Sequence, residues 1–228
     1  MVGSIAFTLA TLAYGVTAIV NVLALRTYHS TSSFPLTDTL VLRTGDARVT
    51  LVSDATDAVV VDATVRRGLV SSRPVATMRG DELVLDGSCR AVFVSFCSVT
   101  LTVHVPRHVN LSGHIEDGSL TAEGLVGTLS LSVVDGHVDL ADMPADTVDL
   151  TTVDGRIDVT LRSSPQSVRI RTTDGRASVC LPTEAPPYSV TERKVDGAIR
   201  VDVPDDPRST LPMDLSTVDG SISVAFCR

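Results

Sequence analysis

Tryptophan is absent from this 228-residue sequence, and only three tyrosines and five phenylalanines are present. A hydrophobic core must therefore be built from aliphatic side chains, and a hydrophobic content of 43% is sufficient for one. Basic residues are also scarce, since 19 Lys and Arg residues face 27 Asp and Glu residues and the net charge is -8. Nucleic-acid-binding proteins usually carry a basic surface, so this balance argues against nucleic acid as a partner.

Charged side chains are missing from residues 1–25. A helix of that length rises about 1.5 Å per residue and can cross a hydrocarbon core of about 30 Å. Because the segment lacks a basic start and has a long apolar run, it favours a retained single-pass transmembrane anchor; a cleaved signal peptide is the alternative. Residues 26–39 are rich in Ser and Thr, which predicts a polar stalk.

No segment beyond residue 39 shows the helical period of apolar residues. Apolar and polar residues alternate instead, as in AVVVDATV at 58–65 and SVTLTVHV at 98–105. This alternation predicts an all-β protein. We expect residues 40–110 to form an irregular β cap and residues 111–228 to form a regular repeat.

The repeat is marked by the dipeptide Asp-Gly, which occurs six times in a similar frame. Its glycines are 18, 19, 20, 22 and 23 residues apart, and the second and fourth residues after each glycine are apolar in all six units. One face of each unit is therefore buried. The predicted turn residues are Asp117, Gly118, Asp135, Gly136, Asp154, Gly155, Asp174, Gly175, Asp196, Gly197, Asp219 and Gly220.

Two geometries fit this unit. Asp-Gly is the preferred loop of a two-residue β-hairpin, and a hairpin meander or sandwich would place Leu150 opposite Val159. In a β-solenoid each unit of about 20 residues is one coil, and Asp-Gly forms a corner. The solenoid is favoured, because only stacking rewards the same residue type in the same column of every unit.

The fifth unit departs from the pattern. Glu192 and Lys194 occupy columns that are mostly apolar or Thr in the other units. Either a β-bulge shifts the register there, or this coil opens its face to solvent. The sixth unit ends the sequence with Ser221–Phe226, which we expect to be a strand with an open edge. Such an edge predicts a homo-oligomer or the addition of a partner's strand.

The recurring T-x-D-G-x-I-x-V unit behind an apolar N-terminal segment resembles the bacterial "putative adhesin" family of β-strand-repeat proteins of unknown function. The resemblance covers residues 40–228, and its specificity comes from six copies in one frame. It implies a right-handed β-helix and a role in adhesion, sensing or scaffolding at the cell envelope. The family has no established catalytic residues to transfer.

Four cysteines allow two bridges. Cys89 and Cys97 enclose seven residues, a spacing that matches no zinc finger or zinc ribbon, and we expect a disulfide between them. Cys180 and Cys227 fall at the ends of the fourth and sixth units, where they are either bridged or two buried thiols. An oxidised pair would place the β domain outside the cytoplasm.

The stacked aspartates could bind calcium, although one Asp per coil is sparse for such a site, and a turn-capping role explains the residue type without a metal. We therefore predict no metal or cofactor. Arg156 and Arg176 follow their glycines directly and would be neighbours on the surface. They could hold an anionic envelope polymer, or they could balance the acidic column beside them.

Motifs of nucleophilic, metal-dependent or phosphate-binding enzymes are missing, and the five histidines are scattered. The sequence therefore predicts a non-enzymatic, membrane-anchored envelope module that presents a repetitive β surface to a polymer or protein partner. A self-associating scaffold is the first alternative, and a carbohydrate-active β-helix enzyme is the second.

Overall fold

The computed structural model describes residues 15–16, 25–35, 38–54, 58–67, 75–79, 82–87 and 97–227. Two mixed β-sheets account for the regular structure of these residues, which confirms the all-β class. None of the helical structure in them is long and apolar enough to cross a membrane. The described residues are therefore all-β and contain no transmembrane helix, which corrects the predicted fold class; of residues 1–25, where that helix was expected, only Gly15, Val16 and Leu25 are described.

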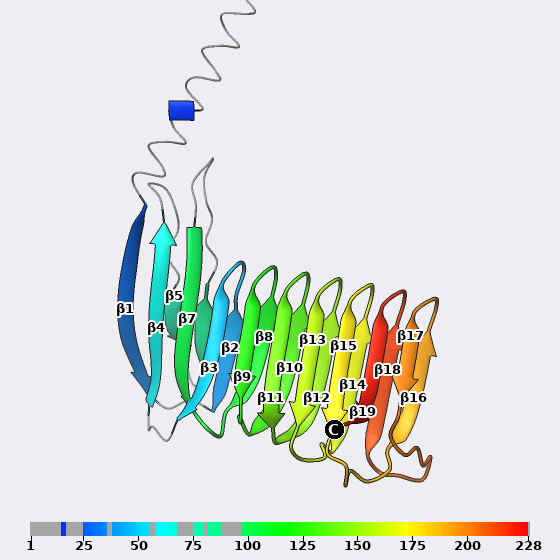
Figure 1. Ribbon diagram of the computed structural model, residues 1–228. Coiled ribbons are helices and arrows are strands. Elements are labelled where there is room, and N and C mark those ends of the chain that lie inside the picture. Colours follow the sequence, from blue (N-terminus) through cyan, green and yellow to red (C-terminus); the bar gives the residue numbers. More distant parts are fainter. Residues whose placement is uncertain are drawn as a thin grey trace, which may run out of the picture.

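The two sheets face each other along the whole stack (Figure 1). Within the described residues, sheet A has ten strands in the order β1 (Arg26–Pro35), β4 (Ala58–Arg67), β7 (Cys97–Pro106), β3 (Arg48–Asp54), β9 (Ser119–Glu123), β11 (His137–Met143), β13 (Arg156–Leu161), β15 (Arg176–Leu181), β19 (Ser221–Phe226) and β17 (Ala198–Val201). Counted in the same way, sheet B has nine, in the order β16 (Ser189–Lys194), β18 (Pro212–Thr217), β14 (Ser167–Thr172), β12 (Ala145–Thr152), β10 (Gly127–Val133), β8 (Asn110–Ile115), β2 (Thr39–Arg43), β6 (Glu82–Asp86) and β5 (Val75–Arg79).

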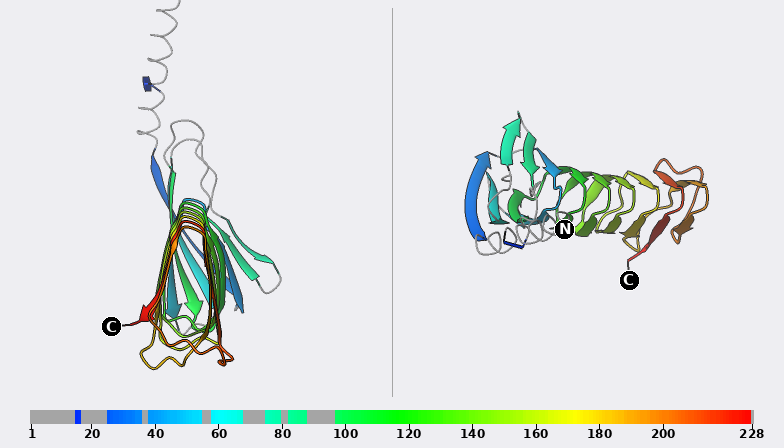
Figure 2. Two further views of the ribbon diagram at one scale, coloured as in Figure 1. Left: turned by 90° about the vertical axis from the view of Figure 1, so that its right-hand side faces the viewer. Right: turned by 90° about the horizontal axis from the view of Figure 1, so that it is seen from above.

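Successive repeat units stack in parallel, one strand in each sheet. Leu150 of β12 pairs with Leu131 of β10 and Ile170 of β14, and not with Val159 as a hairpin would require. The register is thus that of a solenoid. Viewed along the stack, the coils superimpose on one flattened loop (Figure 2).

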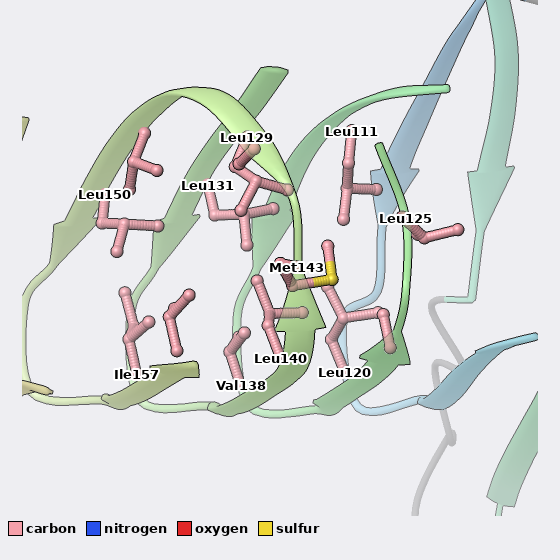
Figure 3. Close-up of a cluster of buried hydrophobic side chains, with 14 of the residues drawn as sticks. Leu111, Leu120, Leu125, Leu129, Leu131, Val138, Leu140, Met143, Leu150 and Ile157 are labelled. Atoms are coloured by element: carbon pink, nitrogen blue, oxygen red, sulfur yellow. The ribbon is translucent and has the colours of Figure 1, made fainter. Parts of the chain in front are cut away.

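The core fills the space between the sheets with aliphatic side chains. Leu111, Leu129, Leu131 and Leu150 of sheet B face Leu120, Val138, Leu140 and Ile157 of sheet A, and all eight are at most 3% exposed (Figure 3). Each such side chain contributes about 1.5–3 kcal/mol when fully buried. Since the coils repeat the same columns, the core continues from coil to coil through aliphatic side chains.

The order of the last two coils is exchanged relative to the sequence. Strands β18 and β19 of the sixth unit lie between β14–β15 and β16–β17, so the fifth unit forms the end of the stack. Glu192 of β16 stands in the inward column that Leu215 fills in β18. A coil with a charge in that column is tolerated at the end, where its inner face is open, but not between two others.

This exchange corrects two expectations. Ser221–Phe226 is not an edge strand, because β19 pairs with β15 on one side and β17 on the other. Glu192 and Lys194 need no bulge, since β16 keeps its register with β18 and its inward face is exposed. Of the two explanations for the fifth unit, the one with the open face is correct.

Residues 26–106 are more regular than expected. β2–β3 forms a coil that pairs in parallel with β8–β9 on one side and with β6 and β7 on the other. β4 and β5 then continue the two sheets with antiparallel strands. Residues 26–35 are not a free stalk but the antiparallel edge strand β1, which pairs with β4 along its whole length.

Candidate functional site

The six Asp-Gly pairs lie at the corner where the chain passes from sheet B to sheet A, along the upper edge of the stack in Figure 1. The exchange of the last coils places Asp219 between Asp174 and Asp196. All six aspartates are exposed, and all but one of the six glycines are buried. The corner therefore presents a line of carboxylates above a backbone floor.

Backbone hydrogen bonds join each corner to the next. The carbonyl oxygen of Gly136 accepts a hydrogen bond from the Arg156 amide at 2.9 Å, and that of Gly155 accepts one from the Arg176 amide at 3.0 Å. None of these glycines has a positive φ. The hairpin explanation for the Asp-Gly pair is therefore wrong.

Glycine is required at the corner because neighbouring coils approach each other closely there. A Cβ atom on Gly155 would lie 2.6 Å from Cγ1 of Val133 and 2.7 Å from the carbonyl oxygen of Gly136. A Cβ atom on Gly175 would lie 2.8 Å from Oγ1 of Thr152. Only a residue without a side chain fits where neighbouring coils pack this tightly.

A groove of about 530 Å³ crosses the corner over four coils. Its lining consists of Asp154, Asp174, Asp196 and Asp219, the glycines that follow them, and Arg156, Arg176, Ala198 and Ser221. The carboxylates accept hydrogen bonds, whereas the guanidinium and hydroxyl groups donate them. One row of acceptors and one row of donors thus run side by side along the stack.

The two arginines of this groove are neighbours in sheet A, as their positions after successive glycines predict. Arg156 and Arg176 are direct neighbours on β13 and β15. Nε of Arg156 lies 2.9 Å from a carboxylate oxygen of Asp158, two residues along the same strand. Its charge is therefore partly balanced within its own coil.

Exposed aliphatic side chains stand next to the carboxylates. Val153, Val218 and Val195 directly precede three of the groove's aspartates and are 40%, 43% and 70% exposed. Such exposure is high for valine, which is usually buried. The corner therefore offers apolar as well as polar contacts to a ligand.

The calcium alternative depends on how the corner aspartates are arranged. Among the residues that the structure describes, no three His, Cys, Asp or Glu side chains come together in an arrangement that could hold a metal ion. The aspartates point outward from separate coils, so they act as single carboxylates. The calcium alternative has no geometric support.

A second polar surface lies on the outer face of sheet B, and the sequence analysis missed it. Arg169 and Arg171 of β14 and Arg193 of β16 lie on either side of β18. Arg193 comes 24 residues after Arg169 and 22 after Arg171, and the exchanged coil order inserts Ser216 of β18 between Arg171 and Arg193. A depression of about 160 Å³ lies between them.

The histidines are at the surface, as expected for His104. Its ring lies on the outer face of sheet A, with Nδ1 at 3.7 Å from Asp54 and Nε2 at 3.8 Å from Asp62. His29 of β1 shares a 3.0 Å hydrogen bond with the hydroxyl of Thr64. These contacts join β1, β3, β4 and β7 at one end of sheet A.

The cysteines are oxidised where they are described. Cys180 and Cys227 form a disulfide with a Cα–Cα distance of 5.1 Å, because the coil exchange makes their strands direct neighbours. Of the two alternatives for Cys180 and Cys227, a bridge or two buried thiols, the bridge is therefore correct. Cys97 is also disulfide-bonded, and Cys89, its predicted partner, lies outside the described residues.

Solved structures resemble this chain, although no protein family and no curated protein match its sequence. A putative cell adhesion protein from Clostridium sporogenes has a TM-score of 0.51 and 10% identity, and the match covers 89% of this chain and 100% of that chain. The chain has the fold of a bacterial putative adhesin. A putative adhesin from Bacteroides fragilis matches at 14% identity over 87% of this chain and 97% of its own, with a TM-score of 0.46.

The adhesin fold agrees with the resemblance that the Asp-Gly repeat predicts. At this level of identity the likeness concerns the fold and assigns no role to any residue. The function of the two polar surfaces has to be argued from their own chemistry.

Proposed function

We propose that this domain is a non-enzymatic, extracytoplasmic adhesion-type module that binds an extended, hydroxyl-rich glycan along the Asp-Gly groove. The observation that carries the proposal is the groove itself, in which four stacked coils each present a carboxylate beside a glycine backbone and three of the four add a side-chain donor, Arg156, Arg176 or Ser221. Its adhesin fold supports a binding role rather than catalysis.

The chemistry of the groove suits sugars. Sugar hydroxyls donate hydrogen bonds to the Asp174 and Asp219 carboxylates and accept them from Arg176. The exposed valines beside them can contact the apolar faces of sugar rings. The carboxylates repeat at about 4.8 Å, the spacing of strands in a sheet, and three of the four coils add an exposed valine.

Repetition gives the groove affinity through many weak contacts. One coil offers a single carboxylate and one or two donors, which binds a sugar weakly. A polymer that spans four coils engages equivalent groups in each, so the later contacts are intramolecular and add avidity. Long glycans should therefore bind much more tightly than short ones.

The Cys180–Cys227 disulfide supports the proposed extracytoplasmic location of the domain. Cys180–Cys227 is a structural bridge, and such bridges persist in oxidising compartments and are rare in the cytosol. A glycan-binding role at the outer surface of the cell fits the same compartment.

A glycan-binding screen on the full-length protein tests the proposal. We expect neutral polysaccharides to bind, and we expect Asp174→Ala/Asp219→Ala to weaken the affinity about tenfold or more. Asp139→Ala is the control, because Asp139 is exposed on sheet A outside the groove. Absence of binding, or equal binding by both variants, would refute the assignment of the groove; release of reducing sugars would refute the non-enzymatic role.

A further inference from the structure

Six outward side chains form a regular grid on sheet B at the end of the stack. The register places Arg169, Asp214 and Thr191 in one row across β14, β18 and β16. The second row contains Arg171, Ser216 and Arg193. The strands alternate with buried residues at Ile170 and Leu215, so all six side chains leave the same face.

The first row is close to neutral. Arg169 lies 3.6 Å from the Asp149 carboxylate and 3.9 Å from that of Asp214. These N···O distances are longer than the 2.7–2.9 Å of a charge-assisted hydrogen bond. The guanidinium of Arg169 therefore keeps donors that these carboxylates do not use.

The second row carries uncompensated positive charge. Arg171 lies 3.5 Å from Asp149, which it shares with Arg169, and Arg193 makes no ion pair with any residue in the described part of the chain. Ser216 stands between Arg171 and Arg193, two strand spacings or about 10 Å apart. Two like charges around a hydroxyl are unfavourable to each other, and an anion between them removes that repulsion.

The depression between these side chains is lined by Arg169, Arg171, Thr191, Arg193, Asp214, Leu215 and Ser216, and its volume is about 160 Å³. A single phosphate or carboxylate group fits a space of this size. Arg can grip either group with two parallel N–H donors, and Ser216 adds an O–H donor.

We propose that this arginine grid is a second binding site, which takes the phosphate or carboxylate groups of an extended polyanion. The site is on sheet B, and its residues line no part of the Asp-Gly groove. The protein as a whole is acidic, with a net charge of -8, so a polyanion is repelled elsewhere and held at this grid.

Binding of two soluble polymers to the full-length protein tests the site. Poly(glycerol phosphate) supplies phosphate groups, and polygalacturonate supplies carboxylates. We expect at least one of them to bind at low salt and to be released as the salt concentration rises, because exposed charges are screened. Failure of both polymers to bind would overturn the proposal, and the polymer that binds more tightly identifies the anionic group.

Arg171→Gln/Arg193→Gln should weaken that binding about tenfold or more. The matched control is Arg162→Gln/Arg208→Gln, which removes the same charge from exposed positions outside the grid and should bind as the unaltered protein does. Equal loss in both double variants would mean that net charge alone governs binding, and it would overturn the site.

Two further measurements separate loss of binding from loss of folding and separate the arginine grid from the glycan groove. Arg193→Gln alone, at an exposed position of the end strand, should retain the thermal midpoint and still lose several-fold in affinity. A protein that binds the polyanion but no neutral glycan would refute the glycan groove and leave the arginine grid in place, so the two proposals fail separately.

Discussion

Gly155 shows how a single residue type is imposed by its neighbours. Its α-carbon lies where a side chain would meet both Val133 and the carbonyl oxygen of Gly136. That carbonyl cannot move away, because it accepts the hydrogen bond from the Arg156 amide. The packing of one coil on the next thus fixes glycine at the corner.

Gly155→Ala should therefore destabilise the protein by about 2 kcal/mol or more, as inserted atoms do in a tightly packed interior. Urea unfolding followed by circular dichroism measures the change. Asp154→Ala is the control, since Asp154 is exposed and should change the stability by less than about 0.5 kcal/mol. Equal effects of the two changes would contradict the close-approach argument.

Tyr188 is the largest fully buried side chain, and it lies in the loop after β15. Its hydroxyl donates a 3.0 Å hydrogen bond to the carbonyl oxygen of Pro165, in the loop after β13. Burial raises the pKa of Tyr188, and a hydrogen bond with Ser164 lowers it by less. The folded protein therefore holds the neutral phenol more firmly than the unfolded chain does.

This makes the stability sensitive to alkaline pH. The contribution is fully present below the unfolded pKa of 10.0 and is lost as the pH rises through the higher folded pKa. Tyr188→Phe should cost about 1–3 kcal/mol at pH 7, because the Pro165 carbonyl loses its partner. Urea unfolding at pH 8 and pH 11 should show a smaller alkaline loss for Tyr188→Phe than for the unaltered protein; equal losses would contradict the argument.

Strand β16 ends sheet B and carries charges on both faces. Glu192 and Lys194 point inward, where interior coils have Leu215 and Thr217. Inward-pointing charges are a known device that stops edge strands from pairing with other chains. The end of the stack is therefore closed to further coils by its side chains, although its backbone groups are free to pair.

Glu192→Val/Lys194→Val should remove this barrier and make the protein associate end to end. Sedimentation velocity over a wide concentration range should show larger species for the variant than for the unaltered protein. Thr191→Val is the control, because Thr191 faces outward on the same strand. A variant that sediments as the unaltered protein does at all concentrations would show that the charges do not protect this end.

The periodic columns allowed the coil and its inward residues to be predicted, because burial in a stack repeats with the same period as the sequence. Ile157, the second residue after its glycine, accordingly lies between Val138 and Ala177. The exchange of the last two coils was not predicted, since all units share these columns and differ only at Glu192 and Lys194. The arginine grid was missed for a different reason: Arg171 and Arg193 stand in an outward column of sheet B, whereas only the inward columns and the residues after each glycine were compared.

At the scale of the whole molecule, the core joins the two sheets, and a disulfide near the carboxyl end links two neighbouring strands of sheet A. Cys180 and Cys227 are 47 residues apart in sequence and join β15 to the residue after β19. By the chain-entropy relation, a loop of that length stabilises the folded state by about 4 kcal/mol.

Cys180→Ser/Cys227→Ser should therefore lower the free energy of unfolding by about 2–4 kcal/mol. Differential scanning calorimetry with and without reductant measures the effect. The unaltered protein should lose more thermal stability on reduction than the double variant does, because only the bond at Cys97 remains to be reduced there. An equal loss in both would place the effect of reduction entirely at Cys97.

The exchanged coil order also affects the sequence in which strands can pair during synthesis. A polypeptide that emerges amino end first displays β16 and β17 before β18 and β19 have been made, yet the places beside β14 and β15 belong to the later pair. Those places stay vacant until residues 212–226 arrive, and during that interval a strand from another molecule can compete for them. Closure of the Cys180–Cys227 bond then locks the late strands into these positions.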